Sequence, residues 1–166
     1  MGTSEKPLRT TIFAFIWSCR ISRPCFSGRN TRGLQKSNTL EQNLIDNGNI
    51  TEGSASNAWI IKNSNTIVTH PANNKILRGV TRDTIIKILK KNSFNIKEKP
   101  FNLIEAKNAK EAFLTSSTLS VLPVVKIDNY NISNGKPGDI TKKIINLYNN
   151  YICKNKITLS KELKIA

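Results

Sequence analysis

Apolar residues recur at helical spacing in two segments of the chain, residues 81–91 and residues 139–152. Both patterns predict amphipathic helices, the first of them capped by Thr81. The apolar positions are Ile85, Ile86, Ile88 and Leu89 in the first segment and Ile140, Ile144, Leu147 and Tyr151 in the second. A third, shorter helix is predicted over residues 103–110.

Short apolar segments separated by turn residues predict strands between these helices. Asn47-Gly48 supplies the positive backbone dihedral angles of a type I′ turn, so residues 44–50 are expected to form a hairpin. A second hairpin is expected to join residues 58–62 to 66–70. Further strands are predicted over residues 95–100, 111–115 and 121–127. No apolar run reaches the roughly 18 to 20 residues that span a bilayer.

Residue usage divides the chain of 166 residues into two parts. Five of the seven Arg residues and two of the three Cys residues lie in the first 33 positions, and Lys, Asn and Ile dominate afterwards. We expect a leader outside the domain over residues 1–35, without structure or produced by aberrant translation. The domain is expected over residues 36–152 and a C-terminal tail over residues 153–166.

The location of the protein is inferred from the leader and from the cysteines. The apolar run at residues 11–17 is at the lower limit for a signal peptide and precedes a poor cleavage site. Cys19, Cys25 and Cys153 show no paired spacing, which argues against a disulfide scaffold and against a zinc site. We therefore expect a cytoplasmic protein without a bound metal.

The net charge of +15 raises the alternative of a basic nucleic-acid-binding module. The Lys residues are dispersed along the chain, and no nucleic-acid-binding motif accompanies them. This distribution favours solvated surfaces over a nucleic-acid partner.

Three segments carry the residues that indicate a chemistry. They are Thr51-Glu52-Gly53-Ser54 with Asn57, then Thr69 to Asp83 with Gly79-Val80-Thr81, then Ser116-Ser117-Thr118. In this order and at these spacings they resemble the class IV (fold-type IV) aminotransferases that use pyridoxal 5′-phosphate (PLP), most closely those that act on D-amino acids. The resemblance covers roughly residues 36–152. It implies an α+β fold, the C-terminal cofactor-binding domain of these enzymes, with a curved, mainly antiparallel sheet and flanking helices.

The resemblance also implies roles for individual residues. Glu52 matches the carboxylate that keeps the pyridine nitrogen of the cofactor protonated, and Leu77 matches an apolar residue that packs on the ring. Val80 and Thr81 match the phosphate site, where the first amides of a helix are unpaired and carry partial positive charge. The cofactor-binding residues implied in this way are Glu52, Leu77, Gly79, Val80, Thr81, Ser116 and Ser117.

Some positions depart from the family pattern or have another reading. Ala55 stands where these enzymes often have serine, and Ser117 stands where they often have threonine. Asn57 is expected to fix its own turn through its side-chain amide. His70, the only histidine, is expected to be structural and not a general base.

One part of the family machinery is not found. No motif for the lysine that forms a Schiff base with PLP, nor for the arginine that reaches its phosphate, occurs in residues 1–35, and Lys36 is a poor candidate. No catalytic residue is therefore assigned, and we expect a C-terminal fragment that is inactive alone. In the full-length family enzyme, a homodimer, the expected reaction moves an amino group between a D-amino acid such as D-alanine and a 2-oxo acid.

Three alternatives remain open beside this reading. The chain could be a relative of branched-chain aminotransferase or of aminodeoxychorismate lyase. It could be a subunit completed by a separately encoded N-terminal half. The third alternative, from another class, is the nucleic-acid-binding module.

Overall fold

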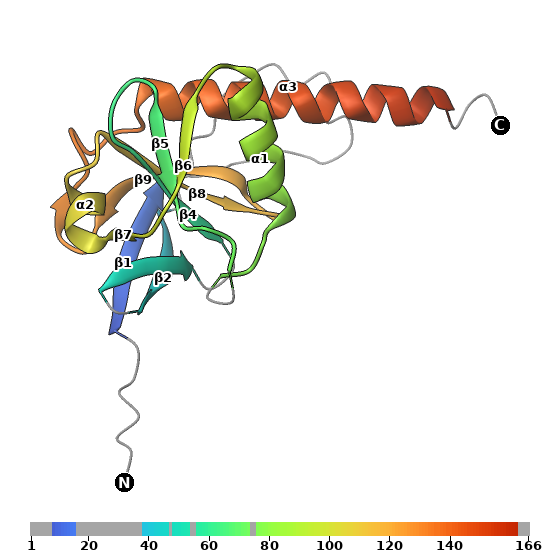
Figure 1. Ribbon diagram of the computed structural model, residues 1–166. Coiled ribbons are helices and arrows are strands. Elements are labelled where there is room, and N and C mark those ends of the chain that lie inside the picture. The colour runs from blue at the N-terminus through green and yellow to red at the C-terminus, as the bar shows by residue number, and fades with distance from the viewer. Residues whose placement is uncertain (1–7, 16–37, 47, 54–55, 74–75, 163–166) are drawn as a thin grey trace, which may run out of the picture.

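A computed structural model of the protein describes residues 8–15, 38–46, 48–53, 56–73 and 76–162. Within these ranges the chain forms one large sheet with three helices (Figure 1). The helices are α1 (Val80–Lys91), α2 (Leu103–Lys107) and α3 (Asp139–Glu162). The strands are β1 (Leu8–Phe15), β2 (Asn38–Asp46), β3 (Asn49–Gly53), β4 (Asn57–Ile61), β5 (Thr66–Thr69), β6 (Asn95–Glu98), β7 (Phe101–Asn102), β8 (Glu111–Ser116), β9 (Ser120–Ile127) and β10 (Tyr130–Asn131).

The strands are paired antiparallel with one exception, so the expected α+β class with a mainly antiparallel sheet is confirmed. The order is β6-β5-β4-β8-β9-β1-β2-β3-β7, and β10 pairs with β9. An additional pairing between β3 and β4 closes the six strands β4, β8, β9, β1, β2 and β3 into a ring. The exception is the parallel pair β5–β6, which α1 connects as a β-α-β unit.

The two faces of β4 contribute to two separate hydrophobic clusters. Ala58 and Ile60 face the first cluster, together with Phe101 and Leu114. Trp59 and Ile61 face the second, where the sheet packs against the apolar faces of α1 and α3 through residues such as Ile85, Leu89 and Ile144. Alternation along a strand places neighbouring side chains on opposite faces, which explains why every residue of β4 is buried.

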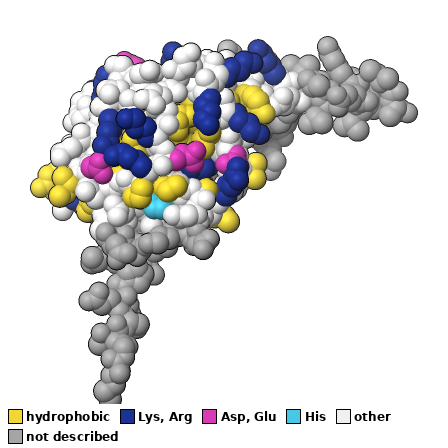
Figure 2. Space-filling view, viewed as in Figure 1, with side chains coloured by type: hydrophobic (Ala, Val, Ile, Leu, Met, Phe, Trp, Pro, Cys, Tyr) yellow, Lys and Arg dark blue, Asp and Glu magenta, His cyan; other side chains and the backbone are white. Residues whose placement is uncertain are grey.

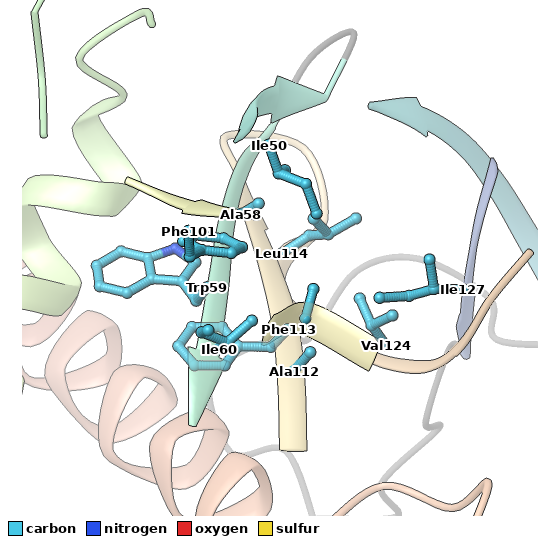
Figure 3. Close-up of a pocket in the computed structure, with 11 residues that line it drawn as sticks. Ile50, Ala58, Trp59, Ile60, Phe101, Ala112, Phe113, Leu114, Val124 and Ile127 are labelled. Carbon is cyan, nitrogen blue, oxygen red and sulfur yellow. The ribbon is translucent and has the colours of Figure 1, made fainter. Parts of the chain in front are cut away.

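A small void lies around β4 and β8, lined by residues of the first cluster together with Trp59 and Phe113 (Figure 3). Its volume is about 10 Å³, and its lining is apolar. A volume of this size holds about one water molecule. The void is therefore a packing feature and not a ligand site.

Both predicted hairpins are confirmed. β2 and β3 pair with Asp46 opposite Asn49, and Gly48 has φ of +75°. The second hairpin joins β4 to β5, and the Oδ1 atom of Asn63 accepts hydrogen bonds from the amides of Asn65 and Thr66. Asn47 lies outside the described residues.

The predicted helix over residues 103–110 ends at Lys107 and the predicted strand over residues 95–100 ends at Glu98, and three larger differences follow. Residues Leu8–Phe15 of the expected leader form β1, which pairs with β2 and β9; this segment is rich in Thr, Ile and Phe, which favour strands. The last helix was expected to end at residue 152 but α3 continues to Glu162, because neither Gly nor Pro interrupts the segment. Thr81 is not the cap of α1, since Gly79 holds that position.

The surface of the described part is mixed in charge. Lys and Arg side chains are spread over the face shown in Figure 2, and acidic side chains lie between them. None of the helices in the described ranges is long and apolar enough to cross a membrane.

Candidate functional site

The site begins at Asn57, the first residue of β4. In the sheet Asn57 lies opposite Glu52 of β3 on one side and Thr115 of β8 on the other. Its Nδ2 atom donates a hydrogen bond of 2.8 Å to the carbonyl oxygen of Leu77. The side-chain amide of Asn57 therefore holds the segment before α1, whereas the sequence suggested that it fixes its own turn.

Close packing between Gly79 and Asn57 sets the position of the helix start. A Cβ atom added at Gly79 would lie 2.5 Å from Oδ1 of Asn57, well inside van der Waals contact. Gly79 has φ of −68° and ψ of 136°, so its backbone is ordinary for any residue. Glycine is needed here for the close approach and not for its conformational freedom.

Thr81 connects the first turn of α1 to the end of β8. Its hydroxyl group donates a hydrogen bond of 3.1 Å to the carbonyl oxygen of Ser116, and only 6% of the residue is exposed. The Oγ atom of Ser116 accepts the amide of Leu119 at 3.0 Å, while Ser117 is exposed at the following turn. The two segments, 35 residues apart in sequence, thus meet at one point.

No side chain caps the N-terminus of α1. Gly79 is the N-cap residue and carries no side chain that could bond to the amides of the first turn. Such amides together carry a partial positive charge, and they favour anions. Next to them, Val80 is 81% exposed and Leu77 is 76% exposed. The helix start thus combines donors for an anion with two exposed apolar side chains.

The predicted site residues converge on this region, as far as they are described. Leu77, Gly79 and Val80 lie in the segment held by Asn57, and Thr81 contacts Ser116. Glu52 lies opposite Asn57 in the backbone pairing, but its side chain and residues 54–55 lie outside the described part. Lys36 also lies outside it.

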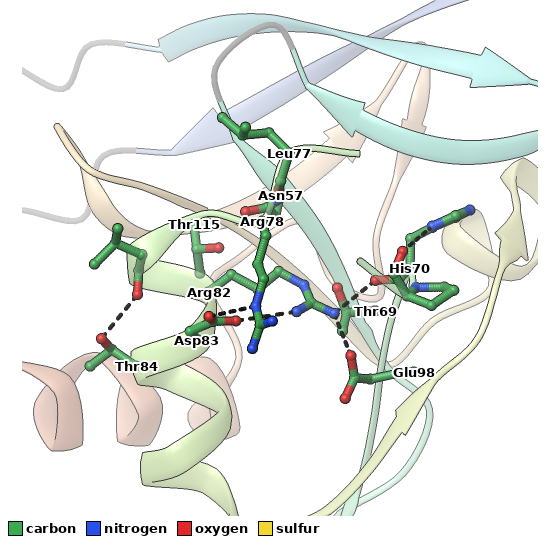
Figure 4. A network of polar contacts seen from close by, with 12 residues as sticks. Asn57, Thr69, His70, Leu77, Arg78, Arg82, Asp83, Thr84, Glu98 and Thr115 are labelled. Carbon is green, nitrogen blue, oxygen red and sulfur yellow. Dashed lines mark hydrogen bonds and ion pairs between the residues drawn. The ribbon is translucent and has the colours of Figure 1, made fainter. Parts of the chain in front are cut away.

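Two buried charged residues were not predicted from the sequence: Arg82 lies beside the site, and Glu111 lies at the opposite end of β8 from Ser116. Arg82, in the first turn of α1, is buried at 1% exposure and is bonded to the carbonyl of His70 and to Glu98 (Figure 4). Glu111 of β8 accepts the amides of Ile140 and Thr141 at the start of α3. Arg82 is flanked by Thr81 and Asp83, and Glu111 follows Lys110, so the neighbouring sequence gives no signal that either charge is buried.

His70 is buried, in agreement with the structural role expected from the sequence. It is 4% exposed, and its Nδ1 atom lies 2.9 Å from the carbonyl oxygen of Pro71. Among the described residues, no group of His, Cys, Asp or Glu side chains is placed to hold a metal ion. The polar groups at the helix start are backbone amides and hydroxyl groups, which suit an oxyanion.

Comparison with known proteins defines the class to which this arrangement belongs. The family model for amino-transferase class IV matches residues 40–127, more than half of the chain. The chain belongs to the class IV aminotransferase family.

Individual relatives show which members it is similar to. It is 40% identical over 110 residues to a D-alanine aminotransferase from Bacillus licheniformis, covering 66% of this chain and 38% of that protein. It is 43% identical over 107 residues to a D-alanine aminotransferase from Listeria monocytogenes serotype 4b (strain F2365), covering 64% and 37%. The chain thus spans less than two fifths of the length of these curated relatives.

A solved structure supports the fold. The branched-chain amino acid aminotransferase from Thermobaculum terrenum, in its PLP-form, superposes with a TM-score of 0.60 at 26% identity. The match covers 64% of this chain and 35% of that one. The expected fold of the class IV aminotransferases is confirmed.

Proposed function

We propose that this chain forms the phosphate-binding side of the PLP site in a transaminase. The observation that carries the proposal is the hydrogen bond from Thr81 to Ser116, because it joins the uncapped start of α1 to the end of β8 at 3.1 Å. Family membership and the PLP-form of a structural relative support the choice of ligand.

The residues present fit the phosphate group of such a cofactor. A phosphate is a dianionic acceptor of several hydrogen bonds, and it is bound well by helix amides and hydroxyl groups. Because Gly79 has no side chain, the helix start lies close to Asn57. For the same reason, no side chain at the N-cap position blocks the approach of a phosphate group to the first amides of α1. Val80 and Thr81 would offer amides, while Ser116 and Ser117 would offer hydroxyl groups from the opposite side.

The remaining predicted residues would bind the rest of the cofactor. When bound, PLP supplies an electron sink for removal of the substrate Cα proton. Leu77, exposed beside the helix start, would pack against the pyridine ring. Glu52, opposite Asn57 in the sheet, would hold a proton at the ring nitrogen.

The proposed reaction is amino transfer between a D-amino acid, with D-alanine as the first candidate, and a 2-oxo acid. The names of the curated relatives support this substrate class. Branched-chain amino acids are the second candidate, because the structural relative above is a branched-chain aminotransferase. We further propose that the protein works in the cytoplasm and that the complete enzyme is a homodimer.

No residue of this chain is assigned as the Schiff-base lysine, so we propose that the chain alone binds PLP without catalysing transamination. The test is absorbance titration of the purified full chain with PLP, followed by borohydride reduction and peptide mapping, with a D-alanine and 2-oxoglutarate assay alongside. Saturable binding without a specific lysine adduct and without pyruvate formation is expected. A single modified lysine together with turnover would show that the chain does contain a catalytic lysine. If PLP does not bind saturably, the proposed PLP-binding function is wrong.

A further inference from the structure

Arg82 occupies an unusual position for a charged side chain. It is the third residue of α1, and its side chain is 1% exposed. Its Nη2 atom donates to the carbonyl oxygen of His70 at 2.9 Å and to Oε2 of Glu98 at 2.7 Å. A buried charge without partners is strongly unfavourable, so these bonds are needed to keep the guanidinium group in place.

The contacts of Arg82 reach three strands beneath the helix start. His70 directly follows β5, and Glu98 ends β6 (Figure 4). The guanidinium carbon also lies 5.9 Å from the centre of the Trp59 ring in β4. These elements form the β5-α1-β6 unit and its neighbour in the sheet. One side chain therefore ties the first turn of α1 to the sheet.

A series of contacts leads from the same region back to the start of α1. The Nε1 atom of Trp59, which lies beside the guanidinium, donates a hydrogen bond of 2.9 Å to Oγ1 of Thr115. The next residue is Ser116, whose carbonyl accepts the hydroxyl group of Thr81. Thr81 and Arg82 are adjacent, so these contacts fix the helix start from two directions.

One hydrogen-bond donor of the Arg82 side chain lacks an acceptor within the part of the chain that the structure describes. The Nε atom of Arg82 is buried and has no partner among the described residues. A buried donor without an acceptor is unfavourable. The side chain therefore keeps its place through its two Nη2 bonds, its ion pair with Asp83 at 3.6 Å and its packing against Trp59. If Arg82 served only to stabilise the core, its buried unpaired donor would make it an unfavourable residue at this position.

We infer that Arg82 is a positioning residue for the phosphate seat, by which we mean the amides of Val80 and Thr81 and the hydroxyl groups of Ser116 and Ser117. Arg82 holds the first turn of α1 so that the amides of Val80 and Thr81 both point toward the same anion. The inference rests on the proposed function. Arg82 itself does not touch the ligand in this account. Its effect passes through the backbone of residues 79–82, and it should therefore act on the phosphate group of a ligand and not on the ring.

The test compares PLP with pyridoxal, which has the same ring and no phosphate group. The dissociation constant of each compound is measured by absorbance or Trp fluorescence titration for the full chain, Arg82→Gln and Glu98→Gln. The matched control is Lys87→Gln, which removes a positive charge from the exposed side of the same helix. Circular dichroism and urea unfolding establish that each variant is folded.

The expected result is a loss of about tenfold in PLP affinity for Arg82→Gln, the scale of one well-placed hydrogen bond, with pyridoxal affinity changed less than about twofold. Glu98→Gln should shift the same ratio in the same direction, and Lys87→Gln should leave it unchanged. Glu98 is 41% exposed, so its variant keeps the test valid if Arg82→Gln does not fold.

Two outcomes would overturn the inference, and they are distinguishable. If the unchanged chain prefers PLP over pyridoxal and the folded variants keep that preference, Arg82 does not position the phosphate seat while the proposed function stands. If the unchanged chain shows no preference for PLP, the phosphate seat is absent and the proposed function fails together with this inference.

Discussion

Gly79 and Asn57 fit against each other with no room for an added side chain, because a Cβ atom at Gly79 would lie 2.5 Å from Oδ1 of Asn57. The same Asn57 side chain donates to the carbonyl oxygen of Leu77. The side-chain amide of Asn57 thus helps to set how the chain enters α1. The orientation of the helix start depends on this contact as well as on the bond between Thr81 and Ser116.

The Gly79→Ala substitution should displace Asn57 and break its bond to Leu77. The free energy of unfolding is expected to fall by about 1–3 kcal/mol, as for overpacking of a tight contact. The measurement is urea unfolding of Gly79→Ala, Asn57→Ala and the double variant. Because Asn57→Ala removes the clashing atom, the two losses should not add. Additive losses would show that the two residues do not interact.

The Thr81→Val substitution preserves shape and removes one hydroxyl group. We expect a loss of roughly fivefold to tenfold in PLP affinity, since the bond to Ser116 that holds the helix start is lost. Thr84→Val is the matched control, because its hydroxyl group bonds only within the helix, to the carbonyl of Val80. Equal losses for the two variants would show that the contact with Ser116 does not shape the site.

Glu111 should be among the most sensitive residues for stability. Its carboxylate accepts the amides of Ile140 and Thr141 and the hydroxyl group of Thr141, at 2.7 to 3.1 Å. Glu111→Ala is expected to lower the free energy of unfolding by about 2–4 kcal/mol, from the lost helix cap and the lost charged hydrogen bonds. Asp139→Asn, at a 96% exposed position of the same helix start, should change it by less than about 0.5 kcal/mol. A small effect of Glu111→Ala in urea unfolding would contradict this role.

Glu105 should make stability depend on acid pH. The hydrogen bond from Lys62 and the backbone amide of Asn102 hold the pKa of Glu105 below its ordinary value of 4.5. A carboxylate with a lowered pKa in the folded state stabilises the protein above its unfolded pKa, and this contribution disappears as the pH falls through the folded pKa.

The check is the difference in urea midpoint between the unchanged chain and Glu105→Gln from pH 6 to pH 3. The difference should be constant above about pH 5 and shrink as the pH falls below about 4. A difference that does not vary with pH would show that the charge of Glu105 contributes nothing. Lys62→Met should reduce the same pH dependence, because Lys62 is the principal partner at 2.6 Å.

Local signals in the sequence predicted much of the fold. Asn47-Gly48 and the Asn63 turn predicted both hairpins, and the Ile-rich face of residues 81–91 predicted α1. These features depend on neighbours in sequence, which is why they could be read directly. The strand at Leu8–Phe15 could not, because its formation depends on partners in β2 and β9 that are distant in sequence.

The proposed site was predicted from its motifs, but the buried charged residues were not. Gly79 and Thr81 were identified from the start of a helix, whereas Arg82 and Glu111 bond to residues 12 to 30 positions away. Only the folded chain shows that these charges are buried. The resemblance to a family therefore predicts a phosphate site at the start of α1, and the structure shows the contacts that fix this helix start.

The most direct test of a phosphate site at the start of α1 is a two-dimensional amide NMR spectrum of the full chain with added PLP. We expect the largest shifts at the amides of Val80 and Thr81, with smaller shifts at Ser116 and Ser117. Pyridoxal should shift the helix amides much less, because it carries no phosphate group. If the largest shifts lie at surface lysines or elsewhere in the sheet and the start of α1 is unchanged, the proposed phosphate site is wrong.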